Sequence, residues 1–272
     1  MSKKAGISFY VALAAFVFIV MFPFIWVFLT SIKPPGEITS FSWFTKNPSL
    51  GSYEAALTSR PLLTYMKNSF MVATLTTILS ITLASLSAYA LTRLPIRGKG
   101  VIFGVILAAS MFPQIAIISP IYNFITGLGL RNTYTGLVIP YITFSLPIAI
   151  WILSTFFNKI PYELEEAAKL DGASPFQTYR KIILPLAAPA IFTTAILVFI
   201  GAWNEYLFAF TINTADAART VPVGISMYQS QFSIPWGDIS AATVIVTLPI
   251  VLVVLLFQKR IVSGLTAGSV KE

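Results

Sequence analysis

The charged side chains that could bind a partner or act on a substrate gather in one stretch, residues 158–181. Charge is otherwise sparse, because only 10% of the 272 residues are charged, against about 25% in ordinary soluble domains. This stretch is therefore the first candidate for function. Its charged residues are Lys159, Glu163, Glu165, Glu166, Lys169, Asp171, Arg180 and Lys181.

Several chemistries are excluded by residue type. The chain has no cysteine and no histidine, so it has no disulfide, no thiolate or imidazole zinc site and no histidine-based catalytic triad. It also lacks the G-x-x-x-x-G-K-[ST] phosphate loop, and Gly98-Lys99-Gly100 is interpreted as a turn. We therefore expect no catalytic residue, no metal and no cofactor in this chain, and ATP hydrolysis only by a partner.

Local signals in residues 158–181 predict two short helices joined at a glycine. Pro161 suits a first helical position, and the glutamates that follow suit the positive end of a helix dipole. Gly172 is typical of a helix C-terminus. Ser174 and Gln177 have the spacing of a capping box, which predicts a second helix start.

The first of these helices would present a surface of small and apolar residues ringed by charge. Two interpretations stay open on physical grounds. The helix docks in a groove of another protein, or it is an amphipathic loop helix lying on the membrane. The residues on this surface are Leu164, Ala167, Ala168 and Leu170.

The rest of the chain predicts an all-α, polytopic membrane protein with six transmembrane helices. Hydrophobic residues make up 56% of the sequence and the mean hydropathy is +0.81. A spanning helix needs about 20 apolar residues, and six uncharged stretches are long enough. We expect one permease-like domain over 1–272, with approximate spans 8–31, 66–92, 101–123, 134–157, 186–211 and 239–259.

Lysine and arginine predict the orientation. With the N-terminus inside, twelve of the 18 basic residues fall on the inner side and six on the outer side. The positive-inside rule then places both termini and the segment 158–185 in the cytoplasm. The loops 33–65 and 212–238 lie outside. The net charge of +8 is thus interpreted as an orientation signal, and no nucleic-acid partner is expected.

Glu205 is the one carboxylate within the predicted spans. A charge in a membrane span usually faces the bundle interior or a water-filled cavity. Glu205, with Asn204 and Trp203, could line a path for a hydroxyl-rich solute. Alternatively Trp203 and Tyr206 anchor the chain at the membrane interface, with Glu205 in water. Both interpretations stay open.

The stretch 158–185 also resembles a known motif. Glu166-Ala167-Ala168, Gly172, Ile182 and Leu184-Pro185 occupy every fixed position of the EAA motif of ABC importer permeases. The resemblance implies a cytoplasmic coupling helix that sits in a cleft of an ATPase subunit. The residues implied in this coupling are Glu166, Ala167, Ala168, Leu170, Asp171, Gly172, Ile182, Leu184 and Pro185.

Three further segments resemble the maltose- and trehalose-type (MalG-like) sugar permeases: residues 264–271, Trp203-Asn204-Glu205, and 111–114. The similarity implies the type I ABC importer permease fold. It implies a substrate path with Trp203, Asn204, Glu205 and Gln114. It implies contact with a solute-binding protein through Tyr228, Gln229, Gln231 and Trp236, and a tail that contacts the ATPase through Gly264, Leu265, Thr266, Gly268 and Lys271.

The function that this resemblance implies is the inner-membrane permease of an ATP-binding-cassette importer. It would move a di- or oligosaccharide, such as maltose or trehalose, by alternating access. The implied partners are a second permease subunit in a heterodimer, two ATPase subunits that bind ATP and Mg, an extracytoplasmic solute-binding protein and membrane lipid. The alternatives are a self-sufficient secondary carrier or channel, and an ABC permease for a non-sugar solute.

Overall fold

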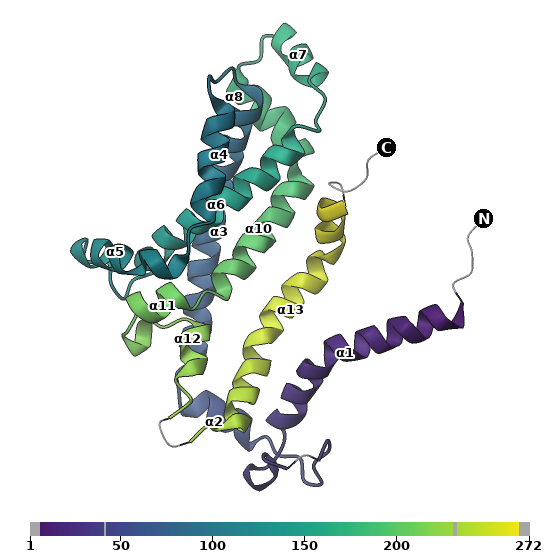
Figure 1. The fold of residues 1–272 in the computed structure, drawn as a ribbon, viewed down its shortest axis with the longest axis vertical. Coiled ribbons are helices and arrows are strands. Elements are labelled where there is room, and N and C mark those ends of the chain that lie inside the picture. The colour runs from purple at the N-terminus through teal and green to yellow at the C-terminus, as the bar shows by residue number, and fades with distance from the viewer. Residues whose placement is uncertain (1–5, 41, 231–232, 267–272) are drawn as a thin grey trace. The chain divides into compact units, whose positions relative to one another are not determined.

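The chain is helical throughout the part that the structure describes. The computed structural model describes residues 6–40, 42–230 and 233–266, and within these ranges every regular element is a helix. The predicted all-α fold is confirmed (Figure 1). The longer helices are α1 (Ile7–Ser31), α3 (Leu62–Arg93), α6 (Tyr134–Phe157), α10 (Ala188–Trp203) and α13 (Trp236–Thr266).

Shorter helices connect the long ones. The α-helical connections are α2 (Gly51–Thr58), α4 (Lys99–Ser110), α5 (Gln114–Gly127), α7 (Glu163–Leu170), α8 (Pro175–Thr178), α9 (Leu184–Leu186), α11 (Leu207–Ile212) and α12 (Val221–Ser226). Two 3₁₀ turns, η1 (Pro35–Glu37) and η3 (Asp216–Ala218), and a π-helical turn, η2 (Tyr179–Ile183), complete the described elements.

Four helices are long and apolar enough to cross a membrane. They are Ile7–Ser31, Leu62–Arg93, Tyr134–Phe157 and Trp236–Gln258, with mean hydropathies of 2.7, 1.8, 2.0 and 2.8. Two bent helix pairs bring the number to six if each pair counts as one span. The described residues therefore form a multi-pass helical protein.

The predicted spans 101–123 and 186–211 each contain a break. The axes of α4 and α5 meet at 93°, and Pro113 stands at their junction. A proline disfavours helix in the residue before it, which ends α4. The second bend, of 77°, falls at Ala187, after Pro175–Leu186. Another break then separates α10 from α11, at residues 204–206.

Contacts divide the chain into two compact units, and the single permease domain over 1–272 stays a prediction. The first unit holds residues 1–63 and 224–251, and the second holds 64–223 and 252–272. The boundaries fall inside α3, α12 and α13.

In the first unit the predicted outer loop 33–65 is folded. It contains η1, α2 and the first residues of α3. Lys33 is 1% exposed, and its Nζ donates to the carbonyl oxygen of Ser42 at 2.6 Å. The same Nζ lies 5.0 Å from the centre of the Trp26 ring. The buried ammonium group thereby ties the start of this loop to the end of α1.

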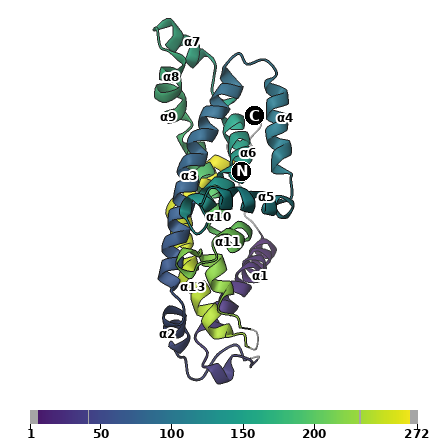
Figure 2. The ribbon, with the colours of Figure 1, turned by 90° about the vertical axis from the view of Figure 1, so that its left-hand side faces the viewer.

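In the second unit, α3, α6 and α10 pack around small side chains. Ala84 and Ala88 on α3 are fully buried against Leu153 and Phe157 of α6. Small residues let membrane helices approach closely. Ile183, from the turn before α10, joins the same core. Helices α7 and α8 lie together at one end of this unit (Figures 1 and 2).

Candidate functional site

The helix α7 ends in a complete glycine cap. Gly172 has a φ of +80°, in the left-handed region that favours glycine. Its N–H donates to the carbonyl of Lys169 at 3.0 Å, and the N–H of Ala173 donates to the carbonyl of Ala168 at 2.9 Å. These two bonds form the Schellman motif. They fix the direction in which the chain leaves α7.

The second helix begins as predicted, with a capping box. The N–H of Ser174 donates to Oε1 of Gln177 at 2.8 Å, and the N–H of Gln177 donates to Oγ of Ser174 at 3.3 Å. The first helix begins at Glu163, two residues after Pro161, which therefore precedes the helix and does not occupy its first position. The two short helices and the glycine between them are as the sequence predicted.

The structure separates the predicted coupling residues into two groups. Glu166, Ala167, Asp171, Gly172 and Leu170 are exposed, and Leu170 is 89% exposed. Of the others, Ala168 is buried, Ile182 and Leu184 are half-buried, and Pro185 is exposed; these last three lie in the π-helical turn and α9 that lead to α10.

An apolar side chain as exposed as Leu170 suggests a surface that a partner covers. Leu164 and Phe176 are also exposed, at 42% and 62%. Around them stand exposed charges, including Glu166 and Asp171. An apolar centre with a polar rim is typical of protein interfaces.

Arg93, at the end of α3, anchors this segment, and sequence reasoning did not find it. Its side chain is 1% exposed, and Nε lies 2.8 Å from Oε1 of Glu165. Nη2 donates to the carbonyls of Phe157 and Ile160, each at 2.6 Å. The guanidinium also lies 4.3 Å from the Tyr162 ring centre. One buried arginine thus joins α3, the end of α6 and α7.

The carboxyl of Glu165, which pairs with Arg93, has a raised pKa. Burial raises the pKa of the Glu165 carboxyl, while the Arg93 guanidinium and the Tyr89 hydroxyl lower it, and the net pKa is raised. Tyrosines fix the second short helix: Tyr89 donates to the carbonyl of Pro175 at 3.2 Å, and the hydroxyls of Tyr179 and Ser85 lie 2.7 Å apart.

A cavity of about 320 Å³ lies elsewhere in the second unit. Two of the predicted substrate-path residues, Gln114 and Glu205, line it. The other two are not among its lining residues. Trp203 is buried with its ring 5.9 Å from that of Phe199, and Asn204 bonds back to the Ile200 carbonyl at 3.0 Å. The cavity lies beside two helix breaks, because Gln114 begins α5 and Glu205 stands between α10 and α11.

Glu205 has a role that the sequence did not indicate. Its Oε1 accepts from the N–H of Phe208 at 2.8 Å and its Oε2 from the N–H of Ala209 at 3.1 Å. The carboxylate therefore caps α11, whose first N–H groups would otherwise lack partners. The carboxylate is therefore not free, and whether Glu205 lines the substrate path or lies at the membrane interface stays a prediction.

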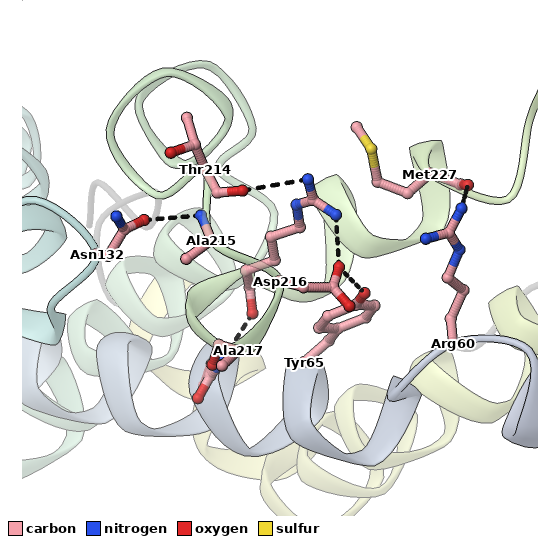
Figure 3. Close-up of polar contacts among 10 residues, drawn as sticks. Arg60, Tyr65, Asn132, Thr214, Ala215, Asp216, Ala217 and Met227 are labelled. Carbon is pink, nitrogen blue, oxygen red and sulfur yellow. Dashed lines mark hydrogen bonds and ion pairs between the residues drawn. The ribbon is translucent and has the colours of Figure 1, made fainter.

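The first half of the predicted outer loop 212–238 is fixed to α3. Asp216 Oδ1 accepts from the Tyr65 hydroxyl at 2.8 Å and pairs with Arg219 at 2.5 Å (Figure 3). Asn68 donates to the carbonyls of Ala217 and Arg219 at 2.9 and 2.8 Å. Residues 214–219 are thus held in place and do not form a loose connector.

Of the predicted binding-protein contacts, Tyr228 is the exception. It is 8% exposed, and its hydroxyl donates to the carbonyl of Ala56 within the first unit. It therefore packs this unit and offers no surface to a partner. Arg60 adds a bond to the Met227 carbonyl at 3.0 Å (Figure 3). Gln229 and Trp236 are exposed, and Gln231 lies outside the described residues.

The predicted tail falls mostly beyond the described part of the chain. Gly264, Leu265 and Thr266 form the end of α13. Gly268 and Lys271 lie outside the described residues. The assignment of these residues to an ATPase contact stays a prediction.

Residues 80–266 match the family described as "Binding-protein-dependent transport system inner membrane component". The match covers well over half of the chain, including the α7–α8 segment and Glu205. The chain belongs to this family, and it is a multi-pass inner-membrane transport permease. This membership decides against the self-sufficient carrier or channel that the sequence had left open.

Curated relatives agree across nearly the whole length. The chain is 45% identical to the trehalose/maltose transport system permease protein MalG of Thermococcus litoralis, over 93% of this chain and 92% of the relative. It is 42% identical to the sulfoquinovosyl glycerol transport system permease protein SmoH of Agrobacterium fabrum, over 92% and 89%. The predicted resemblance to MalG-like permeases is confirmed.

Solved structures show the fold. One structure, of a bacterial ABC transporter involved in the import of the acidic polysaccharide alginate, matches with a TM-score of 0.80. The match covers 95% of this chain and 99% of that chain at 23% identity. The described helices therefore have the fold of an ABC importer permease.

Proposed function

We propose that this chain is one permease subunit of an ATP-driven importer for a di- or oligosaccharide. The observation that carries this proposal is the α7–Gly172–α8 segment. It exposes Leu170 and Phe176 at one end of the second unit, while Arg93 holds its base. An ATPase that binds this segment and changes shape would move α6 and α10 through it, since Ile160 and Tyr179, which flank the segment, share one core with both helices.

The relatives support a sugar as the solute. The proteins from T. litoralis and A. fabrum carry names for trehalose/maltose and sulfoquinovosyl glycerol transport, and SugB of Mycobacterium tuberculosis, 42% identical over 92% of each chain, for trehalose. All three names denote hydroxyl-rich solutes. We therefore place this chain with the sugar importers and not with amino-acid permeases.

The assembly that follows has several components. A second permease forms a heterodimer with this chain, and two ATPase subunits bind ATP and Mg, so this chain itself holds no cofactor. Both termini lie in the cytoplasm, as the excess of inner lysine and arginine indicates. A solute-binding protein docks outside, and the solute crosses by alternating access, as rigid parts rock around its site.

The outer contact with the binding protein is assigned to Gln229 and Trp236, which are exposed, and to Gln231. Gln229→Ala combined with Trp236→Ala is expected to lower ATPase stimulation by loaded binding protein about threefold to tenfold, since exposed aromatics are often anchors of interfaces. Tyr228→Phe is the matched control: it removes a buried hydroxyl and should leave stimulation unchanged. Equal stimulation in all variants would exclude this contact.

The tail assigned to the ATPase runs from Gly264 to Lys271. In the proposed orientation it leaves α13 on the cytoplasmic side, where the ATPase pair lies. A single cysteine in place of Ser269 should form a cross-link to an ATPase subunit. The absence of any cross-link in every nucleotide state would remove this part of the proposal.

Uptake in proteoliposomes tests the proposed function. The chain alone is expected to show no saturable sugar uptake. The complete transporter, with the second permease, the ATPase and the loaded binding protein, should take up trehalose or maltose. This uptake should occur only when ATP is present on the side of the membrane that carries the ATPase. Saturable uptake by the chain alone, or ATP-independent uptake by the full set, would contradict the proposal.

A further inference from the structure

Two buried hydroxyl groups in the cavity have no hydrogen-bond partner. Tyr141 on α6 is 4% exposed and Thr76 on α3 is 0% exposed, and both line the cavity. Within the described residues, neither oxygen forms a hydrogen bond of good geometry. The Glu205 carboxylate is close enough to interact with the Tyr141 hydroxyl, but the two groups do not form a hydrogen bond of good geometry. Burying an unpaired hydroxyl is unfavourable, so a partner from outside the chain is expected.

Neighbouring hydroxyls in the same lining are paired within the chain. Thr194 Oγ1 donates to the carbonyl of Ala190 at 2.8 Å, and the hydroxyls of Ser145 and Ser80 lie 2.7 Å apart. Thr76 and Tyr141 therefore differ from their surroundings. Ser154 on α6 also has a buried hydroxyl without a partner, but it does not line this cavity, so Thr76 and Tyr141 are the two such hydroxyls among the described residues of this lining.

The lining has the composition of a site for a neutral, hydroxyl-rich molecule. Phe144 and Phe208, whose ring centres are 5.3 Å apart, add apolar surface. Hydroxyls donate and accept, as sugar hydroxyls do, and Glu205 keeps acceptor positions beyond the two that cap α11. Among the described residues no lysine or arginine lines the cavity, so a carboxylate or phosphate would face Glu205 without a cation.

Cavity size sets a further limit. A volume of about 320 Å³ is at the lower end of the range for small-molecule sites, roughly 300–1,000 Å³. Such a cavity suits a small sugar or one end of a longer one. The two adjacent helix breaks are also typical of solute sites in transporters, where backbone irregularity lines a cavity.

We propose that this chain carries its own solute subsite, in which the hydroxyls of Thr76 and Tyr141 and the carboxylate of Glu205 bind an uncharged, hydroxyl-rich solute. The subsite deepens the proposed function and rests on it. It lies wholly within the second unit. This permease would therefore bind the solute with its own side chains, in addition to any site on the partner subunit.

The test uses the complete transporter in lipid nanodiscs and the double variant Thr76→Val/Tyr141→Phe. Without solute, the variant should melt at or above the wild-type temperature, because it removes two unpaired buried hydroxyls. Trehalose or maltose should raise the melting temperature of the wild type. In the double variant the rise should fall by at least half, and the KM of uptake should increase about tenfold, the effect of losing two ordinary hydrogen bonds.

Thr77→Val is the matched control, because the Thr77 hydroxyl already bonds to the carbonyl of Ala73 at 2.7 Å. It should keep the wild-type response to sugar. The inference is overturned if the double variant keeps the full sugar response, or if it melts lower without solute, since the hydroxyls would then be structural or bridged by water. It is also overturned if no neutral sugar, or only an anionic one, shifts the wild type.

The proposed function is judged separately in the same preparation. Co-purification of the ATPase and ATP-dependent uptake by the wild type would uphold it even where the double variant behaves as wild type. Failure of both would remove the proposed function itself.

Discussion

Gly172→Val is expected to lower ATP-driven uptake per mole of inserted permease by about tenfold or more. Gly172 has a φ of +80°, and residues with a Cβ resist this conformation by about 1 kcal/mol or more. A β-branched residue would break the Schellman cap and redirect α8 relative to α7. Among the described residues, no other side chain or backbone atom lies within 4 Å of a Cβ built at this position, so overpacking against them does not contribute.

Two matched variants separate coupling from folding. Gly172→Asn should keep most of the uptake, because asparagine tolerates the left-handed conformation. Gly129→Val carries the same strain, at a φ of +70° with nothing within 4 Å, but between α5 and α6. It should cost some stability and leave ATPase co-purification intact. If Gly129→Val and Gly172→Val lose uptake and ATPase co-purification equally, the substitutions affect only folding.

Glu166→Ala should act in the same direction and more mildly. Its carboxylate is exposed in the first turn of α7, where it can pair with a basic group across an interface. The measurement is uptake and ATPase co-purification side by side. Wild-type values for both would show that Glu166 makes no such contact.

Arg93→Met is expected to release α7 from its anchor. The substitution leaves the Phe157 and Ile160 carbonyls and the Glu165 carboxylate without their buried partner. Breaking a buried ion pair by removing one partner typically costs about 3–5 kcal/mol. Hydrogen exchange of the α7 amides should rise at least tenfold, and uptake should fall with it. Arg97→Met, which removes an exposed arginine of the following turn, should change neither.

The pH dependence gives this prediction a specific signature. Burial raises the pKa of Glu165, and removal of Arg93 takes away a contribution that lowers it, so the pKa rises further. A carboxyl with a raised folded-state pKa contributes its stability fully below the unfolded pKa, and loses it as the pH rises through the folded pKa. Protection of α7 in Arg93→Met should therefore recover as the pH falls, after correction for intrinsic exchange.

The variant Arg93→Met/Glu165→Gln should lose this pH dependence and exchange more slowly than Arg93→Met, because no carboxylate remains to be buried unpaired. If the α7 amides of Arg93→Met exchange at the wild-type rate at all pH values, Arg93 does not anchor α7.

The part of the fold that depends on short-range signals could be predicted from the sequence. Glycine at 172 and the Ser174–Gln177 spacing act within one turn of helix, so residue type alone predicted the corner and the capping box. Apolar runs likewise predicted the four unbroken helices that are long enough to span a bilayer, but not the bends within 101–123 and 186–211. The EAA motif of residues 166–185 then indicated the family of ABC importer permeases.

Contacts between residues far apart in the sequence could not be predicted. Arg93 and Glu165 are far apart in sequence, and nothing in either residue's neighbours indicates the other. Glu205 was recognised as unusual because it is a lone carboxylate in an apolar stretch. Its cap on α11 could not be predicted, because it depends on a helix break that the residues Trp203-Asn204-Glu205 do not indicate. Tyr228 was misjudged because an aromatic in a polar loop suits both packing and a surface.

The most direct test of the account is cross-linking from α7. The chain has no cysteine, so Leu170→Cys provides a unique thiol at the most exposed apolar position of the segment. Leu170→Cys is expected to cross-link to the ATPase subunit in the assembled transporter, whereas Leu128→Cys, at an exposed leucine between α5 and α6, is not. A transporter that takes up sugar normally while Leu170→Cys never reaches the ATPase would contradict the assignment of this segment as the coupling element.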